Sequence, residues 1–295
     1  MRIRYGIPAL AVVVALALSG CVDNSTPSSP SSSGSTVKKD AAAAALVPAT
    51  IAKSGTITIG VDTTYAPNEY KDANGKIVGW EIDMFDVVAA KLGLKADYTS
   101  AGFDTIIPKI TGGSFDVGVS SFTDTTDREK QVDFVNYYSA GILWASTKGK
   151  TVDPDNACGL KVAVETGSTE ETDEVPAKSK ACTDAGKPAI QILKFDGQDQ
   201  ATNAVVQGQA DAMSADSPIT EYAIKESGDK LQVAGKTFGV APYGIAVDKG
   251  SKLAEAIQKA LQSMVDDGSY SKILNKWGVA DGALSDITIN AASKG

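Results

Sequence analysis

The chain has 295 residues, 43% hydrophobic and 22% charged, which is enough for one large domain or two ordinary ones. Its formal net charge is −8, and no basic run provides the footprint of a nucleic-acid-binding protein. Histidine is absent, which excludes histidine-dependent catalytic triads and histidine-ligated metal sites, and three cysteines exclude a multi-cysteine zinc site. We therefore expect no metal or other cofactor.

Residues 1–20 have the pattern of an export signal. Arg2 and Arg4 precede an apolar stretch at 7–18, which is too short to span a bilayer comfortably. The stretch ends in small residues followed by Cys21, which resembles the bacterial lipobox, in which that cysteine is lipidated. The pattern predicts an extracytoplasmic protein anchored to the cell membrane by lipid. The alternatives are a plain secretory signal with a chance cysteine, or a short membrane anchor.

The segment after Cys21 is rich in serine and proline and cannot bury apolar surface. We expect residues 21–54 to form a tether, with a short helical lead-in at 41–45. Loss of residues 1–20 removes two arginines and no acids, which takes the formal net charge from −8 to −10.

Two cysteines remain if Cys21 carries lipid. Export would place Cys158 and Cys182 in an oxidising compartment, which favours a disulfide between them. The alternative is a pair of free thiols, which no histidine could activate.

From residue 56 onward, strand and helix patterns alternate. In the first series the expected strands are 56–62 and 116–121, and the expected helices are 79–92, 105–110 and 124–130. In the second series the expected strands are 160–165, 190–195, 210–214 and 243–247, and the expected helices are 168–180, 198–207, 218–227, 253–266 and 270–277. Residues 278–295 are expected to be a tail.

This alternation predicts an α/β protein with mainly parallel sheets covered by helices. The chain would cross between two lobes at 139–146 and again at 237–247, which makes a double-stranded hinge. The expected domains are lobe one at 55–140 plus 243–285, and lobe two at 141–242. Ligands of open α/β sheets bind at the carboxyl ends of strands, and two lobes can turn those ends toward one cleft.

Three motifs resemble the extracellular solute-binding proteins for polar amino acids, the receptors of ABC importers. They are DTTYAPNE at 62–69, GWEIDM at 79–84 and SSFTDTTDR at 120–128. Trp80 replaces the smaller aromatic or aliphatic residue usual in the second motif. The resemblance covers roughly residues 55–277 and implies the two-lobe, type II periplasmic-binding-protein-like fold.

The third motif is expected to bind the carboxylate of an amino acid. Arg128 follows a strand end, and a guanidinium binds a carboxylate through two parallel hydrogen bonds. The resemblance implies this role for Arg128, with further contacts from Ser120, Ser121 and Thr123. The alternative is a solvated arginine that pairs with Asp124 or Asp127.

The resemblance also implies ligand contacts from lobe two and from two aromatic residues. The backbone near Ser168 and Thr169 would bind the carboxylate, and Asp216 would bind the α-ammonium. Each could instead only cap a helix. Tyr65 and Phe103 match positions that enclose the ligand side chain, with core packing as the alternative for Phe103.

Asp62, Glu69 and Glu165 match positions at or near the ligand side chain. Three acids and no base there favour a basic amino acid such as arginine or lysine over a neutral polar one such as glutamine, asparagine or citrulline. Asp62 and Glu69 could instead be structural.

The expected function is capture of a free amino acid by hinge closure and its delivery to the permease subunits of an importer, by a protein that is a monomer and not an enzyme. The alternatives are an enzyme on the same scaffold, such as a dehydratase, and a sensory receptor module.

Overall fold

A computed structural model describes residues 37–294 of the chain. The expected export signal, the lipidated Cys21 and the first part of the tether lie outside the described residues. Within residues 37–294, no helix is both long and apolar enough to cross a membrane.

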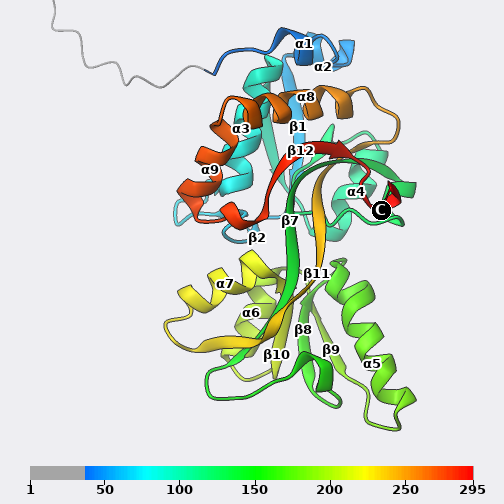
Figure 1. Ribbon diagram of the computed structural model, residues 1–295, viewed down its shortest axis with the longest axis vertical. Coiled ribbons are helices and arrows are strands. Elements are labelled where there is room, and N and C mark those ends of the chain that lie inside the picture. The colour runs from blue at the N-terminus through cyan, green and yellow to red at the C-terminus, as the bar shows by residue number, and fades with distance from the viewer. Residues whose placement is uncertain (1–36, 295) are drawn as a thin grey trace, which may run out of the picture. The chain divides into compact units, whose positions relative to one another are not determined.

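One mixed sheet of nine strands runs through the described part of the chain (Figure 1). Its order is β5–β1–β6–β11–β7–β10–β8–β9, and β12 also pairs with β7. The strands are β1 (Thr56–Val61), β5 (Lys95–Ser100), β6 (Val117–Gly118), β7 (Val132–Thr147), β8 (Lys161–Glu165), β9 (Gln191–Phe195), β10 (Ala212–Asp216), β11 (Leu231–Asp248) and β12 (Ala283–Ile289). We call the part built on β1, β5, β6 and β12 lobe one and the part built on β8, β9 and β10 lobe two.

The two long strands β7 and β11 pair with each other and belong to both lobes (Figure 1). The outer strands of each lobe are parallel to one another, whereas β7 and β11 pair antiparallel with each other and with their neighbours. The fold is therefore α/β with two lobes joined by two strands. The strand expected at 243–247 is only the last part of β11, because the Gly- and Pro-containing stretch before it also pairs with β7.

Helices α3 (Trp80–Leu92), α8 (Leu253–Asp266) and α9 (Ser269–Trp277) pack against lobe one, and α4 (Phe103–Thr111) also belongs to this lobe. The predicted helix at 253–266 is confirmed with the same bounds. Helix α3 begins with acids in its first turn and ends at Gly93 in a left-handed conformation, as its dipole and cap require. Its apolar side chains pack with Ile57 and Ile59 of β1 in the core of lobe one.

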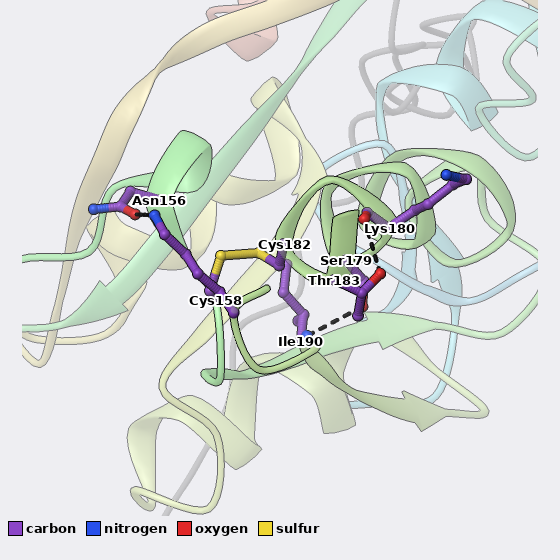
Figure 2. The surroundings of a disulfide bond; sticks show 8 residues. Asn156, Cys158, Ser179, Lys180, Cys182, Thr183 and Ile190 are labelled. Atoms are coloured by element: carbon purple, nitrogen blue, oxygen red, sulfur yellow. Dashed lines mark hydrogen bonds between the residues drawn. A yellow bond between two sulfur atoms is a disulfide. The ribbon is translucent and has the colours of Figure 1, made fainter. Parts of the chain in front are cut away.

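Helices α6 (Gln198–Val206) and α7 (Ser217–Glu226) cover one face of the lobe-two sheet, and α5 (Val175–Asp184) covers the other. A disulfide joins Cys158, in the loop before β8, to Cys182 of α5, as predicted (Figure 2). Next to it, Ser179 on the same helix accepts a hydrogen bond from the backbone of Ile190.

A small antiparallel sheet was not predicted from the sequence. It consists of β2 (Thr64–Tyr65), β3 (Glu69–Lys71) and β4 (Ile77–Val78). Strands this short have no measurable alternation of apolar and polar residues, so periodicity cannot identify them.

The segment predicted as the end of the tether is partly folded. Helix α1 (Ala41–Ala44) is capped by the Asp40 carboxylate and is the expected lead-in, and α2 (Ala49–Ser54) follows it. Ala43 and Val47 are buried in the core of lobe one. The predicted tether at 21–54 therefore includes residues that are folded, because Ala43 and Val47 pack into the core of lobe one.

Three other expectations differ from the structure. Within the expected helix at 124–130 only Arg128–Lys130 form a 3₁₀ turn, called η1. The helix expected at 168–180 begins as a π-turn, η3 (Glu170–Glu174), and continues as α5 to Asp184. The expected tail contains β12 and two 3₁₀ turns, η4 (Ala280–Gly282) and η5 (Ala292–Lys294). A further 3₁₀ turn, η2 (Pro154–Asn156), precedes β8.

Candidate functional site

A small cavity lies between the two lobes. Nine of the twelve predicted site residues line it, together with Glu170. They are Tyr65, Phe103, Ser121, Thr123, Arg128, Glu165, Ser168, Thr169 and Asp216. A larger groove on α6 and α7 includes none of the twelve.

Arg128 reaches across the cavity from lobe one to lobe two. Its Nη1 donates a hydrogen bond to the carbonyl of Thr123 at 2.8 Å, and its Nη2 donates to the carbonyl of Gly167 at 2.9 Å. A guanidinium has five N–H donors, so others remain for a ligand. Within residues 37–294 Arg128 makes no ion pair, whereas Asp127 pairs with Lys130. The arrangement therefore differs from that of a solvated arginine paired with Asp124 or Asp127.

Two stacked aromatic rings support the guanidinium. The rings of Phe103 and Phe122 lie 4.6 Å apart, and the Arg128 Cζ lies 5.4 Å from the first ring centroid and 5.6 Å from the second. Both rings are also part of a core cluster in lobe one. Phe103 thus packs in the core and lines the cavity at the same time. Burial lowers the pKa of Arg128, although nearby acids oppose this effect.

Asp216 lies at the end of β10, where lobe two meets lobe one. Its Oδ2 accepts a hydrogen bond of 2.7 Å from the hydroxyl of Tyr65, which comes from β2 of lobe one. In the described structure its side chain makes no capping bond to α7, so the capping alternative is not what this carboxylate does. Burial, and then the charge of Glu170, raise the pKa of Asp216 well above its ordinary value.

Glu165 ends β8 and is buried against lobe one. Its Oε1 lies 3.3 Å from the Oγ1 of Thr64, and Thr64 in turn accepts a hydrogen bond of 3.0 Å from the backbone of Gln198. Burial, and then the charge of Asp62, raise the pKa of Glu165 well above its ordinary value. Among residues 37–294 Glu165 belongs to no ion pair.

Glu170 is the cavity residue that the sequence analysis did not include. It is the first residue of η3, and its side chain is buried. Its Oε1 has no hydrogen-bond partner among the described residues, and its Oε2 lies 3.3 Å from the Thr169 hydroxyl. Burial raises its pKa. The sequence signal was weak, because an acid in the first turn of a helix ordinarily serves the helix dipole.

The loop at 165–169 is shaped by Gly167 and Ser168. Gly167 has φ of +83°, and a Cβ there would lie 2.8 Å from the Cβ of Asp104 in lobe one. The Ser168 hydroxyl accepts a bond from the backbone N–H of Glu171, so it is the residue that caps η3. Thr169 makes no such capping bond in the described structure and lines the cavity.

Three predicted site residues do not line the cavity. Asp62 accepts hydrogen bonds from the backbone and hydroxyl of Thr64, so it shapes the loop in front of the cavity. The Ser120 hydroxyl accepts a bond from the backbone of Asp62. Glu69 is fully buried behind Ser121, with its oxygens 3.3 Å from the Ser121 hydroxyl. These side chains are structural contacts, the alternative already considered for Asp62 and Glu69.

The cavity thus combines one guanidinium, three carboxyl groups and two aromatic rings. The guanidinium can bind a carboxylate, and the acids can bind ammonium or guanidinium groups. Among residues 37–294 no group of three or more acidic or cysteine side chains is arranged to hold a metal ion.

Known proteins resemble this chain in both sequence and fold. The family model of bacterial extracellular solute-binding proteins, family 3, matches residues 57–280. The arginine-binding protein ArgT of Corynebacterium glutamicum is 37% identical over 248 residues, which cover 83% of this chain and 82% of ArgT. The ABC transporter glutamine-binding protein GlnH of Bacillus subtilis is 33% identical over 213 residues, which cover 70% and 74% of the two chains.

A solved structure of an ancestral arginine-binding protein bound to arginine is 38% identical, with a TM-score of 0.70. The match covers 76% of this chain and 98% of that one. The fold is therefore that of the periplasmic amino-acid-binding proteins. With most of its length matched by the family model, the chain belongs to the bacterial extracellular solute-binding proteins of family 3.

Proposed function

We propose that this protein is the extracytoplasmic receptor of an ABC importer and that it captures a cationic amino acid such as arginine or lysine. It binds the free amino acid between its lobes and presents it to the permease subunits without chemical change. The similarity to a protein named for arginine binding supports this ligand class, and the family supports the receptor role.

The observation that carries the proposal is the charge of the cavity. Arg128 is its one positively charged lining residue, whereas Glu165, Glu170 and Asp216 are negatively charged when ionised. A neutral zwitterion adds no net charge and leaves this excess of acid in a buried site. A cationic amino acid adds one positive charge and offsets part of it.

The chemistry of the two ends of an amino acid fits the two sides of the cavity. The unused N–H groups of Arg128 are donors for the α-carboxylate, and the N–H groups at Thr169 and Thr123 could add to them. Asp216 and Glu170 are acceptors for the α-ammonium. Glu165 is the third acid of the lining, and we assign it to the side-chain cation.

Hinge closure is proposed to bring these two sides together. The proposed rigid bodies are 55–140 plus 243–285 and 141–242, so each boundary falls within β7 or β11. Their pairing has irregularities between Phe238 and Ala241 and between Tyr243 and Gly244, next to the second boundary. Such breaks in a ladder are places where strands bend.

Titration calorimetry of the purified protein with a panel of amino acids tests the ligand class. We expect tight binding of L-arginine or L-lysine and weaker binding of L-glutamine. Tight binding of L-glutamine without L-arginine would favour the neutral polar alternative. Tight binding of L-glutamate without L-arginine would contradict the charge argument, and turnover of any bound amino acid would contradict simple capture.

We further propose that Cys21 carries the lipid that holds the receptor at the membrane. The lipobox-like sequence supports this, and no contact in the described residues bears on it. Detergent phase partitioning of wild-type protein and of Cys21→Ser, made in a bacterial host, tests it. Wild type is expected in the detergent phase and the variant in the aqueous phase; equal partitioning would contradict the proposal.

A further inference from the structure

Ser121 has an unusual backbone for a residue that lines the cavity. Its φ is +50°, in the left-handed region that non-glycine residues seldom adopt. Such a conformation persists only where the surrounding structure holds it, and it often occurs at functional sites. The contacts of Ser121 show what holds it.

The Glu81 carboxyl group accepts hydrogen bonds from both donors of Ser121, the backbone N–H and the side-chain hydroxyl. The Ser121 backbone N–H donates to Glu81 Oε2 at 3.1 Å, and the Ser121 hydroxyl donates to Glu81 Oε1 at 2.8 Å. The hydroxyl of Tyr137 donates to the same Oε1 at 2.5 Å. Three donors converging on one carboxyl group are the surroundings of an ionised carboxylate.

A second carboxyl group lies beside this one. Glu69 is fully buried, as Glu81 is, and in the described part of the chain neither belongs to an ion pair. Two neighbouring carboxyl groups without a cation do not both ionise, so one keeps a proton. Burial raises the pKa of both Glu69 and Glu81, so the hydrogen bonds decide between them. Three donors point at Glu81 at 2.5 to 3.1 Å, whereas the Ser121 hydroxyl lies 3.3 Å from the Glu69 oxygens, so Glu69 is the partner that keeps the proton.

We propose that Glu81 is a positioning residue for the ligand's α-ammonium: an ionised carboxylate that takes both donors of Ser121, beside a protonated Glu69, and so turns only acceptors of Ser121 toward the cavity. This inference rests on the proposed amino-acid receptor function and adds a residue that does not touch the ligand.

The consequence for Ser121 is specific. With its N–H and O–H both donated to Glu81, Ser121 can offer a ligand only its carbonyl and the remaining lone pair on Oγ. Those atoms accept hydrogen bonds from an ammonium and cannot donate to a carboxylate. The expectation that Ser121 helps Arg128 to bind the carboxylate is therefore replaced by a role at the ammonium.

The unusual Trp80 belongs to the same network. Its indole N–H donates to Asn68 Oδ1 at 2.6 Å, which fixes the direction of the Asn68 amide. The Asn68 Nδ2 then donates to the Ser121 hydroxyl at 2.8 Å. A phenylalanine or aliphatic residue at position 80 has no N–H to donate. Trp80 thus helps to keep the Ser121 hydroxyl pointing its proton at Glu81.

The test compares Glu81→Gln with Glu69→Gln. A glutamine at 81 places N–H donors where Ser121 and Tyr137 need an acceptor. A glutamine at 69 replaces a protonated acid with a neutral group of the same shape. The probes are L-arginine, L-lysine and L-glutamine, and each is compared with its analogue that lacks the α-amino group (the des-amino analogue). Titration calorimetry measures the affinity of both members of a pair, for every amino acid that binds the wild-type protein. For Glu81→Gln we expect roughly tenfold weaker binding of the amino acid and less than about threefold change for the des-amino analogue. Glu69→Gln should change both by less than about threefold.

Tyr137→Phe is the matched control, because it removes one donor to Glu81 and leaves Ser121 in place. It should lower the unfolding temperature without changing the ratio of the two affinities. Equal losses for the amino acid and its des-amino analogue in Glu81→Gln, or an equal effect of Glu69→Gln, would overturn the proposal.

A separate measurement keeps the two proposals distinguishable. If no amino acid of the panel binds wild type, the receptor function fails. Urea unfolding without ligand then decides the charge assignment. A larger loss of stability for Glu81→Gln than for Glu69→Gln supports it, and equal losses or the reverse order contradict it.

Discussion

Arg128 donates hydrogen bonds to two protein carbonyls, and in the proposed function it must also bind the ligand. Its guanidinium donates one hydrogen bond to the carbonyl of Thr123 and one to the carbonyl of Gly167, so it links the two lobes at the cavity. A lysine ammonium is a point charge with three donors and no planar fork. Charge alone is therefore not enough at this position.

Arg128→Lys is expected to weaken binding of L-arginine by roughly 100-fold, because a buried, hydrogen-bonded charge pair loses its geometry. Titration calorimetry measures the change. Lys130→Ala is the control: Lys130 is exposed and pairs with Asp127, so its loss should change affinity by less than about twofold. An Arg128→Lys affinity near wild type would argue against a bidentate contact.

The acids of the cavity make binding depend on pH. Burial raises the pKa of Asp216, Glu165 and Glu170, so without ligand they keep protons to a higher pH than ordinary carboxyl groups. A cationic ligand favours their ionised forms. Binding should therefore release protons, and affinity should fall as the pH falls through these raised pKa values.

Calorimetry between about pH 8 and about pH 5, in buffers of different ionisation enthalpy, measures both quantities. We expect net proton release and weaker binding of L-arginine at the acidic end. Glu170→Gln should release fewer protons and flatten the curve. Proton uptake, or affinity that rises toward acid, would contradict the assignment of these acids to the ligand's cations.

At the scale of elements, the C-terminal strand is held at its end by one residue. Asn290 follows β12 with φ of +54°. Its Oδ1 accepts a bond from the backbone of Phe134, and its Nδ2 donates to Asp133, both at 2.8 Å. Beyond it, the backbone of Ala291 donates to the buried Asp124. This segment therefore closes the edge of the lobe-one sheet beside the loop that carries Arg128.

Two substitutions separate the side chain of Asn290 from its backbone. Asn290→Gly keeps the left-handed conformation and should lower the unfolding free energy by about 1–2 kcal/mol through the lost hydrogen bonds. Asn290→Ala should cost about 1 kcal/mol more, because alanine disfavours positive φ. Urea unfolding measures both; equal losses would show that the backbone conformation is not held as described.

The disulfide stabilises lobe two away from the ligand. Cys158 and Cys182 lie 24 positions apart in the sequence and form a disulfide (Figure 2). Neither lines the cavity. Replacing both by serine should lower the unfolding free energy by about 3.5 kcal/mol through the larger entropy of the unfolded chain. L-Arginine affinity should change by less than about twofold at a temperature where the variant is folded. A large loss of affinity with intact folding would place the disulfide in the binding mechanism.

For the whole molecule, both apolar contacts and hydrogen bonds join the lobes. Tyr65 packs in the apolar cluster of lobe two. Tyr65 also donates to Asp216, and Arg128 donates to Gly167, at the cavity, and Gln198 donates to Thr64 outside it. Each such bond contributes about 1 kcal/mol net. Against them stands the cost of burying Glu165, Glu170 and Asp216 together without a second cation. Ligand should therefore decide the balance between open and closed forms.

Small-angle scattering tests this balance. The radius of gyration should be larger without ligand than at saturation with L-arginine, because the ligand supplies the missing positive charge and closes the hinge. Gly167→Ala should oppose closure, because its new Cβ would meet Asp104. A radius of gyration that is unchanged at saturation would contradict hinge closure.

Much of the fold could be predicted because its elements have strong periodic patterns. The helix at 253–266 was predicted to the residue, since its apolar face repeats every three to four residues between polar ends. The strands β2, β3 and β4 were missed because they are too short for periodicity to identify. The strands β5 and β12 and the full lengths of β7 and β11 were missed because each depends on pairing with a distant segment, which local patterns do not encode.

The residues of the candidate site divide in the same way. Chemistry and resemblance predicted Arg128 and Asp216 as ligand contacts, because a guanidinium and an acid at strand ends suit the two ends of an amino acid, and both side chains line the cavity. Glu170 also lines the cavity and was not predicted, whereas Glu69 was predicted and does not line it. Which of two buried acids faces a cavity and which lies behind Ser121 depends on side-chain direction and packing, and neither follows from spacing along the chain.

The sequence by itself indicated the alternating α/β pattern through its periodicity, the class of protein through the resemblance of three motifs to a known family, and a disulfide between Cys158 and Cys182 through the cysteine count and the expected export. These are properties that can be followed along the chain. Only the tertiary structure decided which acids share one cavity and which donors Glu81 takes from Ser121. Those choices are made by burial, which depends on every element that packs around a side chain.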